Sequence, residues 1–211
     1  MAVRVIPWPR VRSAMKRSSG SLPRSPLTTL HSESAPEAEP PLTVPGFWAL
    51  VKEDRDANHG SILTPGFQAM FMYRLGRWAE ADLARRRPAR RFARLMQLFI
   101  RNFYGIELYW TAQFGRRLTI AHQGATVIHA YCTIGDDCVL RQGVTIGATD
   151  ESNASGAPVL GDRVDIGAGA MILGEVKIGS DVRIGPNAVV ITDVPDHSTV
   201  FAPPSRIVRW E

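Results

Sequence analysis

Few side chains of this protein could exchange a proton at neutral pH. Imidazole has an unperturbed pKa of about 6.5, so a histidine can act as a general base there. The 211 residues include five histidines: His31, His59, His122, His129 and His197. The chain has two cysteines, Cys132 and Cys138, and they form no CxxC pair of the kind that binds zinc. The spacing of the surrounding residues must therefore indicate which of these groups does chemistry.

A period of six residues runs through residues 105–211. One aliphatic series continues without a slip: Leu160, Ile166, Ile172, Ile178, Ile184 and Val190. The same spacing occurs upstream, with a two-residue insertion before Ile128: Leu108, Phe114, Ile120, then Ile128, Ile134, Leu140 and Ile146. Neither an α-helix nor an ordinary strand has this period, whereas a triangular coil of about eighteen residues per turn does. The sequence therefore predicts stacked coils around an aliphatic column.

The residues between the aliphatic positions fit the same coil. Glycine often follows the aliphatic residue directly, where we expect the chain to turn a corner. A small or β-branched residue stands four places after it, and Cys132 and Cys138 occupy this position on consecutive sides. We therefore interpret both cysteines as core residues rather than catalytic or disulfide-bonded ones.

One interruption of the period predicts a loop. Ile146 and Leu160 are fourteen residues apart, and the excess lies in the polar stretch ATDESNASGAP. A solenoid accommodates such an insertion as a loop extruded from one corner, and loops of this kind commonly form a binding face.

Residues 46–104 are predicted to be helical. Pro65 suits a first helical turn, and a later segment places Phe92, Leu95, Met96 and Phe99 on one stripe. Six arginines cluster near that segment: Arg85, Arg86, Arg87, Arg90, Arg91 and Arg94. We interpret the cluster as a solvated face, with peripheral contact to an anionic membrane surface or partner as the alternative.

Residues 1–45 are predicted to be a disordered tail. Residues 1–30 are rich in Arg, Ser and Pro. The Pro/Glu/Ala stretch of residues 31–45 cannot bury enough apolar surface to fold. The start resembles an organelle transit peptide. The alternative is a tail that is not a transit peptide, or a start codon assigned too far upstream. We thus divide the chain into a tail (1–45), a helical region (46–104) and a repeat domain (105–211).

Composition excludes several classes of protein. The net charge is +5, but residues 105–211 carry 8 Lys+Arg against 12 Asp+Glu, so we expect no nucleic-acid partner. Two cysteines exclude a disulfide scaffold. No stretch of about 20 apolar residues is present, and we expect a cytoplasmic protein.

The hexapeptide pattern resembles the left-handed β-helix acyltransferases. Residues 46–208 are similar to the serine acetyltransferase branch, through GIELYWTAQFGRRLTIAHQGATVIHAYCTIGDDCVLRQGVTIGAT and IGAGAMILGEVKIGSDVRIGPNAVVITDVPDHSTVFAPPSRIV. FGRRLTIAH followed by RQGVTIG most resembles the acetyltransferases of exopolysaccharide (colanic-acid-type) gene clusters. The resemblance implies a mostly-β fold, a left-handed parallel β-helix after an α-helical N-terminal region. It also implies O-acetyl transfer with acetyl-CoA as co-substrate and no metal.

The resemblance also assigns catalytic roles. It places the general base at His122, which would take the proton of an acceptor hydroxyl that otherwise attacks a thioester poorly. It places an orienting carboxylate fifteen residues earlier, at Glu107. Backbone N–H groups around Ala148 would stabilise the oxyanion of the tetrahedral intermediate.

For coenzyme A, the resemblance implies a groove between neighbouring coils of two subunits, hence a homotrimer or a dimer of trimers. The turns similar to the family's coenzyme-binding turns contain Gly167, Ala168, Gly169, Gly185 and Pro186. Arg206, in APPSRIV, would meet a phosphate of coenzyme A or cap the last coil.

The chain departs from the serine enzymes where they hold the charged groups of serine. Ala121 stands where they carry a carboxylate, and Gly156, Ala157 and Pro158 replace an Arg–His–Pro run. A neutral sugar hydroxyl needs no such ion pairs, and Asp150, Ser152 and Asn153 of the loop could hydrogen-bond it. We therefore expect a saccharide acceptor in exopolysaccharide biosynthesis. Serine O-acetyl transfer, with a small-molecule acceptor, is the alternative. A β-helix metal hydratase and an inactive scaffold are further alternatives.

Overall fold

The computed structural model describes residues 44–82, 86–148, 156–205 and 207. Residues 1–43 of the predicted tail lie outside this part, as do most of the predicted loop (149–155) and Arg206. The last two tail positions already belong to the first helix, which begins at Val44.

A helical region precedes the strands. Pro65 and Pro88 each occupy the first turn of a helix, where the missing N–H leaves no hydrogen bond unmade. Gly105, with φ of 63°, ends the last helix in the left-handed conformation that glycine adopts without strain. The elements are α1 (Val44–Ala57), α2 (Pro65–Glu80), α3 (Arg87–Phe99) and the π-helical turn η1 (Ile100–Tyr104).

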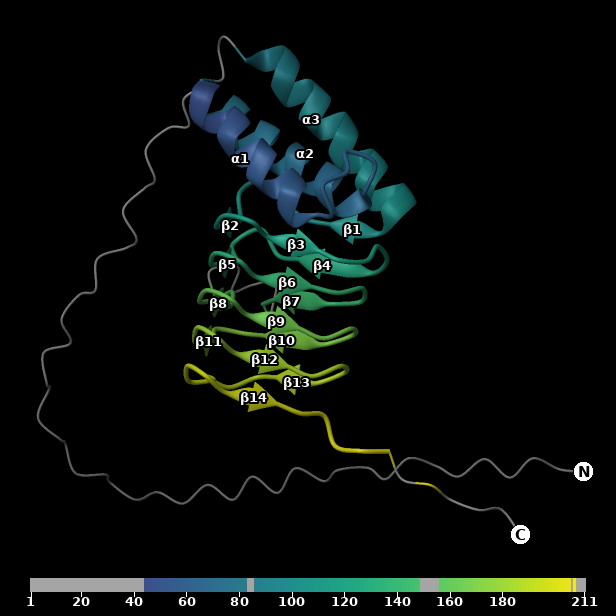
Figure 1. Ribbon diagram of the computed structural model, residues 1–211, viewed down its shortest axis with the longest axis vertical. Coiled ribbons are helices and arrows are strands. Elements are labelled where there is room, and N and C mark those ends of the chain that lie inside the picture. Colours follow the sequence, from purple (N-terminus) through teal and green to yellow (C-terminus); the bar gives the residue numbers. More distant parts are fainter. Residues whose placement is uncertain (1–43, 83–85, 149–155, 206, 208–211) are drawn as a thin grey trace, which may run out of the picture. The chain divides into compact units, whose positions relative to one another are not determined.

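The rest of the described chain forms short parallel strands in three sheets, stacked as coils below the helices (Figure 1). The first sheet has the order β1-β4-β7-β10-β13, the second β2-β5-β8-β11 and the third β3-β6-β9-β12-β14. The strands are β1 (Ile106–Glu107), β2 (Gln113–Phe114), β3 (Thr119–Ile120), β4 (Thr126–Ile128), β5 (Thr133–Ile134), β6 (Val139–Leu140), β7 (Thr145–Gly147), β8 (Val159–Leu160), β9 (Asp165–Ile166), β10 (Met171–Leu173), β11 (Lys177–Ile178), β12 (Arg183–Ile184), β13 (Val189–Val190) and β14 (Thr199–Val200).

The six-residue period positions the core as expected. Val127 pairs with Thr145, eighteen positions later, so one turn of the coil takes three hexads. All aliphatic positions of the predicted series from Leu108 to Val190 are buried. The predicted left-handed parallel β-helix, preceded by an α-helical region, is confirmed.

Both cysteines are free and fully buried, which confirms that they are core residues. Burial raises the pKa of the Cys132 thiol to about 12 and that of Cys138 to about 11. Neither is therefore a thiolate at neutral pH, and a thiol is a weak nucleophile.

The glycines that follow the aliphatic positions serve a different purpose from the one expected. We expected them to turn the corners, but Gly167 has no positive φ. A Cβ on Gly167 would lie 2.5 Å from the backbone nitrogen of Pro186 in the next coil, so glycine is needed for close stacking. The left-handed corner positions are held mostly by other residues, such as Asp137 and Asn187.

One corner carries a column of alternating charges. The column contains five left-handed residues on successive coils: Arg117, Asp137, Arg163, Asp181 and His197. Arg117 binds Asp137 through two hydrogen bonds of 2.5 and 2.7 Å, and Arg163 binds Asp181 through two of 2.7 Å. The guanidinium groups lower the pKa of the Asp137 and Asp181 carboxyls.

This column predicts a loss of stability in acid. A carboxyl whose pKa is lowered by folding stabilises the fold above its unfolded pKa of about 3.9. This stabilisation disappears as the pH falls through the folded value, because the unfolded state takes up the proton first. We expect Arg163→Gln to lower the melting temperature near neutral pH, and the difference from wild type to shrink below about pH 4. Melting curves across this range test the prediction, with the exposed Arg183→Gln as the control whose difference stays constant.

The helices cap the free edge of the first coil. Phe114 of β2 donates its N–H to the Tyr73 hydroxyl, at 2.9 Å. Arg74, on the same helix, donates to the carbonyl oxygens of Phe114 and Gly115. Arg74 is itself held by a buried bidentate ion pair with Asp54 of α1, at 2.8 and 3.2 Å. These contacts fix the helical region on the β-helix and satisfy the backbone groups of an exposed strand edge.

Candidate functional site

His122 lies on the two-residue insertion that interrupts the period. It follows β3, and the turn of residues 121–125 connects this strand to β4. Gly124 and Ala125 both have positive φ, 110° and 51°, so the insertion leaves the regular path of the coil. The His122 side chain is exposed, and among the described residues it has no hydrogen bond or ion pair. An imidazole of this kind is free to receive a proton from a bound molecule.

The end of α1 holds the strand that carries His122. The buried Asn58 donates its amide to the Leu118 carbonyl at 3.0 Å and accepts the Ile120 N–H at 3.0 Å. It thus pairs with the free edge of β3 as a neighbouring strand would. Sequence reasoning missed this residue, because only the helix break at HGSILTPG marks it and its partners are about 60 positions away.

We predict that Asn58→Leu impairs any activity that depends on His122. The change leaves the Ile120 N–H of β3 and the Leu118 carbonyl just before it without partners, which costs roughly 1–3 kcal/mol of unfolding free energy. It also frees the strand preceding His122, so we expect the kcat of such an activity to fall more than its KM rises. Urea unfolding and steady-state kinetics measure both effects. Asn102→Leu, at an exposed position, is the control, and equal kinetics for the two variants would contradict the positioning role of Asn58.

Several predicted coenzyme-binding residues lie in one column with His122. Each follows the carboxyl end of a strand of the third sheet, whose order is β3, β6, β9 and β12. We call this column the His122 edge and define it by residues 121–125, 141–143, 167–169 and 185–187. It contains five of the predicted positions: Gly167, Ala168, Gly169, Gly185 and Pro186.

Packing between coils requires glycine at two positions of the His122 edge, whether or not a coenzyme binds there. Gly169 has φ of 69°, and a Cβ there would lie 2.4 Å from the Asn187 amide oxygen. A Cβ on Gly185 would lie 3.0 Å from the Val200 carbonyl oxygen. Coenzyme binding by this column stays a prediction, as it does for Arg206, which lies outside the described residues.

Arg141, also on the His122 edge, is engaged by its own chain. Its guanidinium forms an ion pair with Asp165 of the next coil and donates to the Ile166 carbonyl at 3.3 Å. The Arg141 guanidinium is therefore occupied by contacts within its own chain.

Glu107 is held by a neighbour other than His122. It lies on β1, paired in register with Val127, and its carboxylate accepts a 2.5 Å hydrogen bond from the Tyr109 hydroxyl. This hydrogen bond raises the pKa of Tyr109 because it favours the protonated phenol. No hydrogen bond joins Glu107 to His122 in the described part of the chain, and the orienting role of Glu107 stays a prediction.

Ala148 and His122 lie at opposite ends of the strands of the first sheet. It follows the last residue of β7, whereas His122 precedes the first residue of the neighbouring strand β4. The predicted loop leaves the coil at Ala148 and returns at Gly156, and its residues 149–155 are outside the described ranges. Within one copy of the chain, the strands of the first sheet therefore separate His122 from Ala148. A site that uses both must combine edges from two copies.

The remaining histidines are less suited to a base. His59 is exposed at the helix break and His197 lies in the charged column, 3.7 Å from Asp181. His129 is partly buried beside Gly147, and its Nδ1 atom has no partner among the described residues. Within the same residues, no three His, Cys, Asp or Glu side chains are grouped to bind a metal.

A comparison with known protein families matches part of the coils. Residues 157–192 match the family described as bacterial transferase hexapeptide (six repeats). Together with the coils, this match shows hexapeptide repeats like those of bacterial transferases.

Individual curated proteins are similar to this chain over part of their length. Serine acetyltransferase of Staphylococcus aureus (strain Mu50) is 45% identical over 119 residues, which are 56% of this chain and 56% of that protein. The serine acetyltransferase of Staphylococcus epidermidis (strain ATCC 12228) is 44% identical over the same length. The chain thus spans just over half the length of the curated relatives it matches.

Solved structures give the same result. The crystal structure of serine acetyltransferase isoform 3 from Entamoeba histolytica, in complex with cysteine, superposes with a TM-score of 0.63 at 28% identity. It covers 78% of this chain and 62% of that one. The serine acetyltransferase of Neisseria gonorrhoeae has a TM-score of 0.63 at 27% identity and covers 77% and 66%. These relatives favour the serine alternative over the exopolysaccharide assignment that we expected.

Proposed function

We propose that this protein transfers an acetyl group from acetyl-CoA to a hydroxyl oxygen, with serine as the first acceptor to test. The observation that carries the proposal is the 45% identity to a serine acetyltransferase over 119 residues. The exposed, unpaired imidazole supports it, because a base must be free to meet the acceptor.

In this mechanism His122 accepts the hydroxyl proton as the oxygen attacks the thioester carbonyl. The tetrahedral intermediate then expels the coenzyme A thiolate, and the imidazolium returns the proton to the sulfur. Backbone N–H groups near Ala148 of a second copy would stabilise the oxyanion. The separation of the His122 edge and Ala148 in one copy supports a homotrimer, and a dimer of trimers fits equally. Sedimentation equilibrium of the full chain should therefore give three or six times 23.2 kDa.

A saccharide hydroxyl is the second candidate acceptor. Ala121 stands beside His122 where the resemblance to serine enzymes implies a carboxylate, and Gly156, Ala157 and Pro158 supply no charged side chain. A free amino acid would bring two charges that these positions leave unpaired.

One assay separates the two acceptors. The purified full chain is mixed with acetyl-CoA and either serine or a neutral sugar, and release of the coenzyme thiol is followed. Faster release with serine supports the first proposal, and faster release with the sugar supports the second. Release that is unaffected by either acceptor would contradict both.

A further inference from the structure

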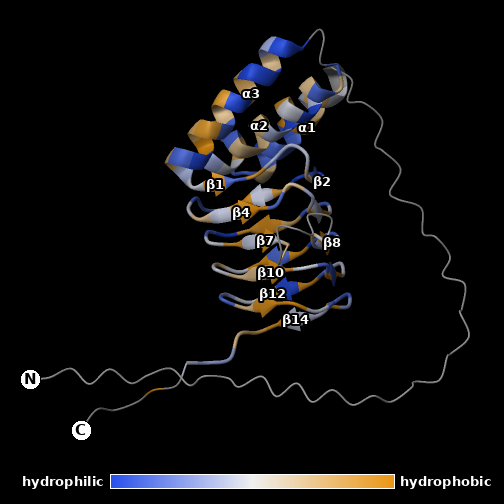
Figure 2. Ribbon diagram, turned by 180° about the vertical axis from the view of Figure 1, so that it is seen from behind, coloured by the Kyte–Doolittle hydropathy of each residue, from blue (hydrophilic) through white to orange (hydrophobic). Residues whose placement is uncertain are grey.

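The helix that precedes the β-helix presents an apolar face to solvent. Five large apolar side chains on α3 and η1 are between 43% and 74% exposed: Phe92, Leu95, Leu98, Phe99 and Phe103. We call them the α3 apolar face. The same helix packs on the core through other residues, the buried Ala93 and Ile100 and the partly buried Met96. The fold of one copy therefore leaves the α3 apolar face unused. In Figure 2 the ribbon of α3 carries both orange, hydrophobic and blue, hydrophilic stretches.

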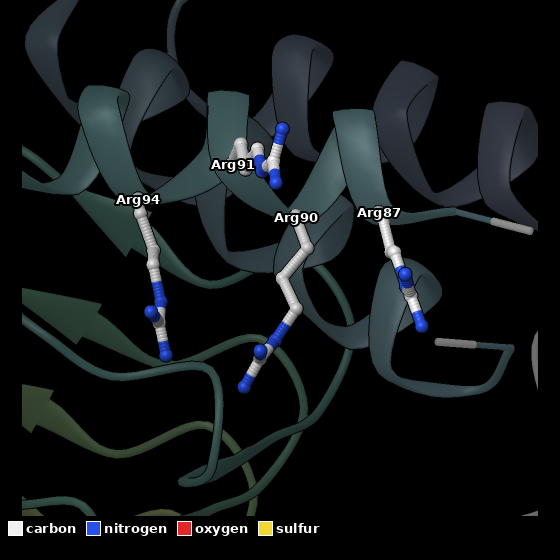
Figure 3. Close-up of a pocket in the computed structure, with 4 residues that line it drawn as sticks. All are labelled: Arg87, Arg90, Arg91 and Arg94. Carbon is white, nitrogen blue, oxygen red and sulfur yellow. The ribbon is translucent and has the colours of Figure 1, made fainter. Parts of the chain in front are cut away.

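Arginines accompany the apolar face. Arg87, Arg90, Arg91 and Arg94 line a cavity of about 440 Å³ on α3. In Figure 3 the side chains of Arg87, Arg90 and Arg94 point to the same side of the helix. Residues 87–104 contain five arginines and no acidic residue. Within the described part of the chain, Arg90 pairs with Glu80 at 2.8 Å, while Arg87, Arg91 and Arg94 have no partner.

These two surfaces together fit the interface of a lipid bilayer. A helix that lies in this interface buries apolar side chains at the level of the acyl chains and presents arginines to lipid phosphates. Arginine suits phosphate because its guanidinium donates two parallel hydrogen bonds. No helix among the described residues is long and apolar enough to cross a membrane.

Other occupants fit the surface less well. A two-fold contact between two copies through α3 would bring like-charged arginines together. A nucleic acid would neutralise the arginines but leave Leu95 and Leu98 in water. We propose that α3 and η1 dock this protein on the surface of a bilayer that contains anionic phospholipids.

The docked helix would hold a defined part of the β-helix near the bilayer. α3 continues through η1 to Gly105, and β1 begins at the next residue. The first coil, which carries His122, is therefore the coil closest along the chain to the docked surface. The proposal does not depend on acetyl transfer, because binding is measured without any substrate.

Vesicle co-sedimentation of the full chain tests the proposal. We expect the protein to sediment with phosphatidylcholine vesicles that contain phosphatidylserine and to be released by high salt. The triple variant Phe92→Ser, Phe99→Ser, Phe103→Ser should lose binding. The triple variant Arg87→Gln, Arg91→Gln, Arg94→Gln should bind more weakly, by about five-fold for each charge removed.

Matched controls change the same kinds of residues elsewhere. Ile62→Ser with Leu63→Ser removes exposed apolar side chains outside α3, and Arg55→Gln, Arg163→Gln, Arg183→Gln removes three charges. Both controls should sediment as wild type does, and circular dichroism should show that all variants are folded. The proposal is overturned if wild type does not bind the anionic vesicles or if the α3 variants bind as well as the controls. A change of oligomeric mass in the α3 variants without vesicle binding would identify a second copy as the occupant, and retention on duplex DNA alone would identify nucleic acid.

Discussion

Replacing His122 with glutamine should lower kcat/KM for acetyl transfer by about 10² to 10⁴. Glutamine keeps most of the volume and polarity of the side chain but cannot accept a proton from a hydroxyl. The unfolding free energy should stay within about 0.5 kcal/mol of wild type, because the imidazole is exposed and has no partner among the described residues. Steady-state release of the coenzyme thiol, together with urea unfolding, measures both quantities.

The control for His122→Gln is His59→Asn. His59 is exposed at the helix break with φ of 68°, a conformation that asparagine tolerates. This variant should retain wild-type kinetics. A His122→Gln enzyme that works within a few-fold of wild type would mean that another group is the base, or that the chemistry needs none.

Replacing Arg74 with methionine should lower the unfolding free energy by about 3–5 kcal/mol. The change removes the partner of Asp54, whose side chain is fully buried, and strands a carboxylate in the interior. It also removes the donors to the Phe114 and Gly115 carbonyls, where the helical region is fixed to the first coil. Urea unfolding followed by circular dichroism measures the loss.

Two further variants show whether the loss arises from the stranded charge. Arg90→Met breaks a half-exposed ion pair with Glu80 and should cost less than about 1 kcal/mol. Adding Asp54→Leu to Arg74→Met should recover part of the loss, because an apolar pair leaves no buried charge. If Arg74→Met costs no more than Arg90→Met, the account of how the helices attach to the β-helix is wrong.

The repeat made the β-helix predictable from sequence. Each hexad points one aliphatic residue inward, so the repeat alone predicts that Ile166, Ile172 and Ile178 are buried. The same logic placed Cys132 and Cys138 in the core correctly. The prediction that the glycines turn the corners was wrong. Gly167 is needed because it lies close to Pro186 of the next coil, and a single hexad does not encode a contact between coils.

The surroundings of the site were less predictable. The two-residue insertion marked the turn of His122, but Asn58, which holds β3, reaches it from a helix about 60 positions away. The stripe of Phe92, Leu95 and Phe99 was visible as a periodic pattern, yet the pattern does not reveal that the core lies against Ala93 and Ile100 instead. Which face of an amphipathic helix is buried depends on its partners in space, and these are set by tertiary contacts.

Mass spectrometry of the acceptor after incubation with acetyl-CoA tests the central claim most directly. The account predicts one added acetyl group on the hydroxyl of serine, or of a sugar, with one coenzyme thiol released for each, and no added acetyl group above background with His122→Gln. An acceptor that gains no acetyl group from the wild-type protein, or that gains it equally from His122→Gln, would contradict the account.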